Sequence, residues 1–312
     1  MCTIGAVAGS RKGPRTLAAI ASVAAVILVA GSAAGARSSP SISAYNGFAT
    51  WIDIFSPKAW SDPEGTVAAI AARGTRTLFL ETGNASQKTD LVRPDGLARL
   101  IEAAHAAGLH VVAWYLPSFV HPARDLRRAL AAIRFRTPSG DSFDSFALDI
   151  ESTDVKVTSR RTARLLALSR SLRDAAGPGY PLGAIIPSPR GMELRPSYWP
   201  GFPFRQLAGI YDVFVPMAYY TYHVHGEEAV RNDVVRAIAL IRQQTGDSGI
   251  PIHVIGGVAD QSKRGDVRGF MRAVADCEPI GFSLYDYFAT KPAAWKLLAA
   301  PPTFEPGSCD LG

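Results

Sequence analysis

The chain lacks the short motifs of several large enzyme classes. Its 312 residues include three cysteines, and none stands at the end of an apolar, strand-like run, which disfavours a cysteine nucleophile. No G-x-S-x-G elbow, no P-loop and no G-x-G-x-x-G turn after the first strand-like run is present. These absences argue against serine-hydrolase and nucleotide-binding chemistry.

The chain also lacks a concentration of one charge. Its formal charge of +6 falls to +3 when the three basic residues of 1–36 are left out, and the other basic residues are scattered. Because nucleic-acid binding needs a basic patch or stripe, nucleic acid is not an expected partner. The 47% hydrophobic and 19% charged residues are typical of an ordinary globular protein.

The N-terminal segment has the pattern of a secretory signal. Three basic residues precede the apolar run "TLAAIASVAAVILVAGSAAGA", which ends in an A-x-A motif at Ala36. We expect residues 1–36 to be a cleaved signal peptide. A membrane anchor is the alternative, because 17–34 is just long enough to span a bilayer. Either way the body of the protein lies outside the cytoplasm, after a Ser-rich linker at 37–44.

Two cysteines follow this segment. In an oxidising compartment Cys277 and Cys309 can form a disulfide that ties the Pro-rich tail at 301–312 to the last helical hairpin. They can also remain free thiols, because connectivity does not follow from sequence alone.

Between 45 and 300 the chain alternates apolar strand-like runs with amphipathic stretches. Helices are predicted, among others, at 95–108, 158–177 and 229–246 from apolar residues at three- and four-residue spacing and a glycine at the end. Eight such units predict an α/β fold with a single (β/α)8 TIM barrel. An open doubly wound sheet is the weaker alternative, since the Gly-rich phosphate turn is missing. The predicted strands are 47–55, 76–81, 110–116, 145–151, 182–187, 212–219, 252–258 and 281–287.

Polar side chains gather at the ends of the predicted strands, where the active sites of such barrels lie. Loops are polar in any case, so part of this enrichment needs no function. The residues are Glu81, Tyr115, Asp149, Glu151, Tyr219, Asp260, Tyr285 and Asp286.

The stretch "DSFALDIES" (144–152) places two carboxylates within a strand pattern. Because side chains alternate along a strand, Ala147, Asp149 and Glu151 share one face, which we expect to point into the barrel. Two carboxylates roughly 6–7 Å apart along a strand interact, so one is pushed toward protonation. We expect Glu151 to be the proton donor and Asp149 to stay ionised. A structural acid pair satisfied by Arg or Tyr is the alternative.

The same stretch resembles the DGxDxDxE signature of the chitinase-like glycoside hydrolases (family 18). Asp144, Asp149 and Glu151 match the pattern, whereas Ser145 replaces Gly and Ala147 replaces the innermost Asp. Met217-Ala218-Tyr219-Tyr220 is similar to that family's M-x-Y-D, with Tyr220 in place of Asp. "DVFVPMAYY" also resembles a strand of bacterial glycosyl-hydrolase-like barrels.

The resemblance implies that Glu151 is the general acid/base, that Asp149 steers a substrate N-acetyl group and that Tyr219 hydrogen-bonds this group. Such substrate-assisted cleavage needs no protein nucleophile. The absence of an acid at Ala147 weakens the implied proton relay. A second scheme pairs the acid with a carboxylate across the mouth, for which Glu81, Asp260 and Asp286 are candidates.

Carbohydrate clefts need aromatic platforms, and aromatic residues lie near the predicted strand ends, although many such residues simply pack in cores. "YHVHGEE" (222–228) alternates possible metal ligands, but no further cluster accompanies it, so we expect His223 to line the cleft and no metal or cofactor to bind. The predicted substrate-binding residues are Trp51, Glu81, Trp114, Tyr115, Asp144, Met217, Tyr220, His223, Asp260, Tyr285 and Asp286.

These patterns together predict a secreted, monomeric glycoside hydrolase that acts on a polysaccharide or cell-wall glycan. A barrel that binds glycans without cleaving them is the alternative.

Overall fold

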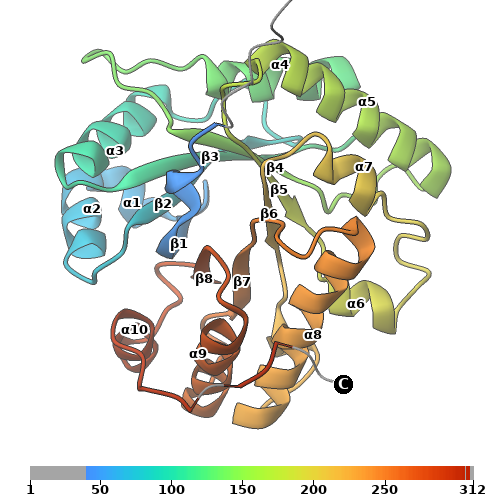
Figure 1. Cartoon of the computed structure of the whole chain (residues 1–312). Helices are drawn as coiled ribbons and strands as arrows, with labels where there is room; N and C mark the ends of the chain where they lie inside the picture. Colours follow the sequence, from blue (N-terminus) through green and yellow to red (C-terminus); the bar gives the residue numbers. More distant parts are fainter. Residues whose placement is uncertain (1–39, 306, 310–312) are drawn as a thin grey trace, which may run out of the picture. The chain divides into compact units, whose positions relative to one another are not determined.

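The computed structural model describes residues 40–305 and 307–309, within which eight parallel strands form a barrel (Figure 1). Helical structure separates each strand from the next. The strands are β1 (Gly47–Ile52), β2 (Thr77–Asn84), β3 (His110–Leu116), β4 (Ser145–Asp149), β5 (Leu182–Ile186), β6 (Val213–Pro216), β7 (His253–Val258) and β8 (Gly281–Tyr285). The predicted α/β class and single (β/α)8 barrel are confirmed.

Strands that follow one another in the chain lie side by side, in the order β6-β5-β4-β3-β2-β1-β8-β7. β1 pairs with both β2 and β8. Between β6 and β7 the barrel is closed by two isolated bridges, Phe214 to Ile252 and Met217 to Ile255.

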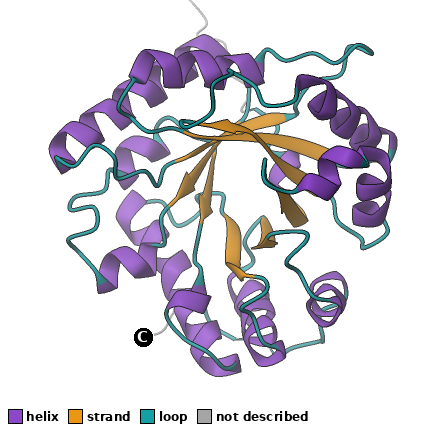
Figure 2. Cartoon of the chain, turned by 180° about the vertical axis from the view of Figure 1, so that it is seen from behind, coloured by secondary structure: helices purple, strands orange, loops and turns teal. Residues whose placement is uncertain are grey.

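Helices surround the strands on the outside (Figure 2). The predicted helices at 95–108, 158–177 and 229–246 correspond to α3, α5 and α8. The described helices are α1 (Pro57–Ser61), α2 (Pro63–Ala71), α3 (Pro94–Ala106), α4 (Pro122–Ile133), α5 (Thr158–Ala176), α6 (Pro189–Leu194), α7 (Phe204–Ala208), α8 (Glu227–Thr245), α9 (Arg264–Cys277) and α10 (Pro292–Ala299), with the 3₁₀ helices η1 (Ser43–Tyr45) and η2 (Tyr220–Tyr222).

Proline and glycine set many of these helix boundaries. Six of the described helices carry Pro in the first turn, where its missing N–H would have no partner in any case. α5 and α8 end at Gly177 and Gly246, whose φ angles of 80° and 77° are readily adopted only by glycine.

Alternation along the strands divides the core into two parts. On β4, Phe146 and Leu148 join the helix-facing core, whereas Ala147 joins the cluster inside the barrel. The interior cluster consists of Ala44, Tyr45, Ala49, Trp51, Phe79, Val112, Trp114, Ala147, Ile185, Val213, Val215, Met217 and Ile255. Asp149 continues the inward face of β4 toward the open end, as its spacing predicts.

Tyr45 closes the N-terminal end of the barrel. Its hydroxyl lies 2.7 Å from Ser145 Oγ, at the start of β4. A Cβ on Gly183 would lie 2.5 Å from the Tyr45 oxygen, so only glycine fits at this point of β5.

A line of hydrogen bonds continues from Tyr45 through the interior. The Tyr45 carbonyl accepts from His253 Nδ1 at 2.8 Å, and His253 Nε2 lies 3.1 Å from Ser283 Oγ. Ser283 Oγ in turn accepts from Trp51 Nε1 at 2.9 Å. Burial lowers the pKa of His253 to about 4, so its ring is neutral and acts as one donor and one acceptor.

Two predictions concern the ends of the chain. The predicted signal peptide and residues 37–39 of the linker lie outside the described residues, whereas Ser43 and Ala44 of the linker belong to η1. Cys277, at the end of α9, forms a disulfide with Cys309, which decides the question that the sequence left open. Within the described part of the chain, no helix combines the length and apolarity needed to cross a membrane.

Candidate active site

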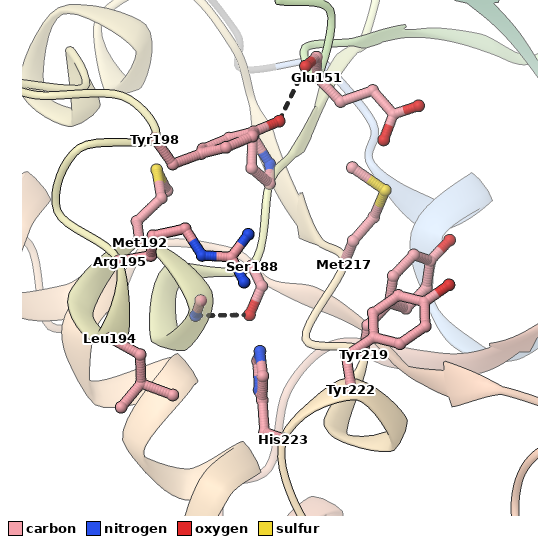
Figure 3. A pocket seen from close by; sticks show the side chains of 12 residues that line it. Glu151, Ser188, Met192, Leu194, Arg195, Tyr198, Met217, Tyr219, Tyr222 and His223 are labelled. Carbon is pink, nitrogen blue, oxygen red and sulfur yellow. Dashed lines mark hydrogen bonds between the residues drawn. The ribbon is translucent and has the colours of Figure 1, made fainter.

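A cleft of about 760 Å³ lies at the C-terminal ends of β4, β5 and β6 (Figure 3). Its walls combine acidic, basic and aromatic side chains. They are formed by Glu151, Pro187, Ser188, Gly191, Met192, Leu194, Arg195, Tyr198, Met217, Tyr219, Tyr222 and His223.

Glu151 follows the end of β4 by two residues, and its carboxylate projects into the cleft (Figure 3). Its backbone carbonyl accepts a hydrogen bond of 2.9 Å from the Tyr198 hydroxyl, which fixes the chain just after the strand. Burial raises the pKa of Glu151, so the carboxyl retains a proton to higher pH than an exposed glutamate does.

Asp149 lies deeper than Glu151 and is 6% exposed. Burial, and then the charges of Glu151 and Glu81, raise the pKa of Asp149 well above its ordinary value. Its Oδ1 has no hydrogen-bond partner among the described residues. Because Asp149 is buried beside Glu151 and Glu81, its carboxyl also retains a proton to higher pH than an exposed aspartate does, whereas the sequence predicted that it stays ionised.

Glu81 approaches the same acids from β2. It is 2% exposed, and its carboxylate accepts hydrogen bonds from the Ile54 amide at 3.0 Å and Asn84 Nδ2 at 3.3 Å. Burial raises its pKa to about 7, with the charge of Asp53 adding to the effect.

Two further acids lie near the barrel mouth. Asp53, just after β1, accepts a hydrogen bond of 3.2 Å from Tyr285. Asp286 follows β8 and accepts from the Ala289 amide, and burial raises its pKa. Asp53 was not among the predicted site residues, although it is also an acid at the end of a strand.

Tyr219 occupies the wall of the cleft beside Met217. It has a left-handed backbone, with φ 42° and ψ 52°, which turns the chain from β6 into η2. Burial raises the pKa of Tyr219 well above its ordinary value, followed by the charges of Asp149 and Glu151, so its hydroxyl remains a proton donor. Tyr222 packs edge-on against Tyr219 and is 64% exposed.

The opposite side of the cleft carries basic groups. His223 Nδ1 lies 3.3 Å from Asp233 Oδ2 on α8, and Asp233 is buried. The side chains of Arg195 and His223 lie across the pocket from the Glu151 carboxylate (Figure 3). Tyr198, Ser188 and Arg195 come from the segment between β5 and β6, where the sequence offered no periodic pattern to select them.

Several predicted substrate-binding residues do not line this cleft. Trp51 lies inside the barrel, stacked on Phe79 with ring centroids 4.1 Å apart. Trp114 also lies in the interior cluster. Glu81, Tyr285 and Asp286 lie near the mouth outside the cleft wall, and Asp260 is exposed.

Three others have a place elsewhere in the fold. Tyr115 points outward and donates to Asp125 at 2.8 Å, and buried Tyr220 pairs with Ser262 at 2.9 Å. Asp144 stands before β4, where it accepts from the Val111 amide at 2.7 Å and contacts His105. Since Asp144 lies at the far end of the strand from Glu151, its carboxylate cannot reach the same ligand.

The possible metal ligands in "YHVHGEE" contact different partners and do not meet at one point. His225 contacts Asp266, and Glu227 accepts from Arg268. Among residues 40–305 and 307–309 no group of three or more His, Cys, Asp or Glu side chains is arranged to hold a metal ion.

Comparison with solved structures shows that several glycoside hydrolases share the barrel fold of this chain. The spore cortex-lytic enzyme SleL of Bacillus cereus is similar with a TM-score of 0.61 and 10% identity, over 81% of this chain and 73% of that one. A chitinase of Chromobacterium violaceum gives 0.57 and 11%, over 83% and 100%. An endo-beta-1,4-mannanase of Thermotoga petrophila gives 0.59 and 11%, over 78% and 68%.

No protein-family model and no curated protein matches the sequence. The likeness to these enzymes is therefore a likeness of fold.

Proposed function

We propose that this protein is a secreted glycoside hydrolase that cleaves a polysaccharide or cell-wall glycan, with Glu151 as the general acid. The observation that carries this proposal is the pair Asp149 and Glu151 at the end of β4, where burial raises both pKa values beside an open cleft. Both shifts favour a state in which the pair holds a proton, which a general acid needs.

In this mechanism Glu151 protonates the oxygen of the scissile glycosidic bond. Asp149 and the Tyr219 hydroxyl hold the N-acetyl group of the sugar, whose carbonyl oxygen attacks the anomeric carbon. Water then opens the resulting intermediate, with Glu151 as the base. One observation favours this route over a protein nucleophile: both carboxylate oxygens of Glu81 are engaged in hydrogen bonds.

Action outside the cytoplasm is part of the proposal. The disulfide between Cys277 and Cys309 supports it, because disulfides persist in oxidising compartments. The basic and apolar pattern of residues 1–36 points the same way.

The test is release of reducing sugar from chitin, peptidoglycan and neutral polymers. The wild type should cleave at least one of them, and Glu151→Gln should lower the rate by about 10²- to 10⁴-fold, the range for a general acid. Glu228→Gln is the matched control, because Glu228 is exposed on α8 and outside the cleft. Cleavage that survives in Glu151→Gln would contradict the proposed role.

A second candidate is a barrel that binds glycans without cleaving them. Ala147 favours it, because this buried alanine leaves Asp149 with no acid at the next inward position of β4. Glycan binding by a wild type that cleaves no polymer would support this candidate.

A further inference from the structure

Acidic and basic groups lie on opposite sides of the cleft. Carboxyl groups occupy one side and the mouth beyond it: Glu151 lines the cleft, and Asp149, Glu81, Asp53 and Asp286 lie toward the barrel axis and the strands β1, β2 and β8. On the β5–β6 side the ionisable lining groups are Arg195, His223 and three tyrosines.

The positive charge of Arg195 is not matched by a neighbouring acid. Its side chain is exposed, and its guanidinium has no hydrogen bond or ion pair to any described residue. The acid closest in sequence, Glu193, pairs instead with Arg190 and with Arg236 at 2.5 Å. Arg190 also lies 3.6 Å from Asp233, so this network balances two cations with two acids.

His223 lines the same cleft as Arg195 and is held in place by a buried acid. Buried Asp233 faces its Nδ1, which leaves Nε2 directed at the cleft wall, 3.4 Å from the position that a Cβ on Gly191 would take. Figure 3 shows this ring nitrogen below Ser188 and the Arg195 guanidinium. The β5–β6 side therefore offers a fixed imidazole nitrogen together with a guanidinium that has no counter-charge.

We propose that the cleft selects a glycan that carries a carboxylate, and that Arg195, assisted by His223, binds this carboxylate on the β5–β6 side. The guanidinium fork matches the two oxygens of a carboxylate. The acids at the mouth repel the same group, so the charge pattern fixes which way the glycan lies across Glu151. This inference rests on the proposed function only in taking the cleft as a glycan site.

Two sources of such a carboxylate are compatible with the site. One is a uronic acid, and the other is an N-acetylated amino sugar with an ether-linked lactate. Each probe has a neutral partner: a uronic acid oligomer is compared with its carboxyl-reduced form, and the lactate-bearing oligomer with a chitin oligomer of equal length.

Binding is measured calorimetrically at low salt with Glu151→Gln, so that no cleavage occurs. At least one carboxylate probe should bind about tenfold more tightly than its neutral partner, the order expected for a charged hydrogen bond in a partly exposed site. Adding Arg195→Gln should abolish this preference, and Arg195→Lys should restore part of it. Arg170→Gln, which removes an exposed charge on α5, should leave it unchanged.

Equal binding of each acid and its neutral partner overturns the inference, as does a preference that survives Arg195→Gln or no binding of either acid probe. Failure of the proposed function looks different. A carboxylate preference that depends on Arg195, in a wild type that cleaves nothing, would retain this inference and remove the hydrolase. Equal cleavage of acidic and neutral polymers would retain the hydrolase and remove this inference.

Discussion

Glu81 gives a prediction whose size follows from the structure. Raising its pKa from 4.5 to about 7 corresponds to about 3.4 kcal/mol, because each pKa unit is worth about 1.4 kcal/mol. Replacing Glu81 with Gln removes this ionisable group. The amide oxygen can still accept from Ile54, but the amide nitrogen faces the Asn84 donor, and the lost hydrogen bond costs about 1 kcal/mol.

Whether Glu81→Gln raises or lowers the free energy of unfolding depends on pH. Below pH about 4.5 Glu81 is protonated in the folded and the unfolded chain, so its shifted pKa contributes nothing. Between pH about 4.5 and about 7 the unfolded chain ionises this carboxyl while the folded protein keeps its proton, so up to about 3.4 kcal/mol of stability is lost, and the loss is complete above pH about 7. We therefore expect Glu81→Gln to be about 1 kcal/mol less stable than the wild type near pH 4.5. Near pH 8 it should be about 2 kcal/mol more stable.

The assay is urea unfolding at both pH values, followed by tryptophan fluorescence, with the free energy of unfolding compared between the two proteins. Glu228→Gln makes the same chemical change on an exposed helix position and should differ from the wild type by a few tenths of a kcal/mol at most. If Glu81→Gln is equally destabilised at both pH values, burial does not raise the pKa of Glu81 as argued.

Two further predictions concern the frame of the barrel. Replacing Cys277 and Cys309 with Ser opens a link across 32 residues and should lower the free energy of unfolding by about 2–4 kcal/mol, measured by denaturant unfolding; an unchanged stability would show that the link is not formed. Gly183→Ala places a methyl group against Tyr45 and should cost at least about 1–3 kcal/mol. Gly179→Ala, with open space around it, is the control, and equal effects of the two changes would contradict the close approach.

The strands were predictable because each is a short apolar run bounded by turn residues. Where the observed strand ends differ from the predicted ones, the causes are local. β1 ends at Ile52 rather than at 55 because Asp53 accepts from the Phe55 amide and turns the chain. β2 continues past 81 to Asn84 through a shift of register between Glu81 and Gly83.

The site was predictable where the strand pattern reaches it. Glu151, Met217 and Tyr219 line the cleft because they continue the inward faces of β4 and β6. Tyr115 and Tyr220 were selected for their position at strand ends. Alternation turns each of them away, since their neighbours Trp114 and Tyr219 point inward.

The basic side of the cleft could not be predicted in this way. Arg195 and Tyr198 lie in the loop that follows the short helix α6 between β5 and β6, where no period relates sequence position to side-chain direction. Their place depends on long-range contacts, such as the hydrogen bond from Tyr198 to the carbonyl of Glu151. The balance of charge around Arg195 likewise depends on Arg236 from α8.

The hydrogen-bonded line inside the barrel has an evolutionary consequence. Ser283 both accepts from Trp51 and contacts His253 Nε2, so losing its hydroxyl would leave two buried polar groups without partners at once. Replacing His253 would likewise release the Tyr45 carbonyl. In related chains we therefore expect Trp51, His253 and Ser283 to be conserved together or substituted together. The residues around the cleft can vary without changing this interior trio.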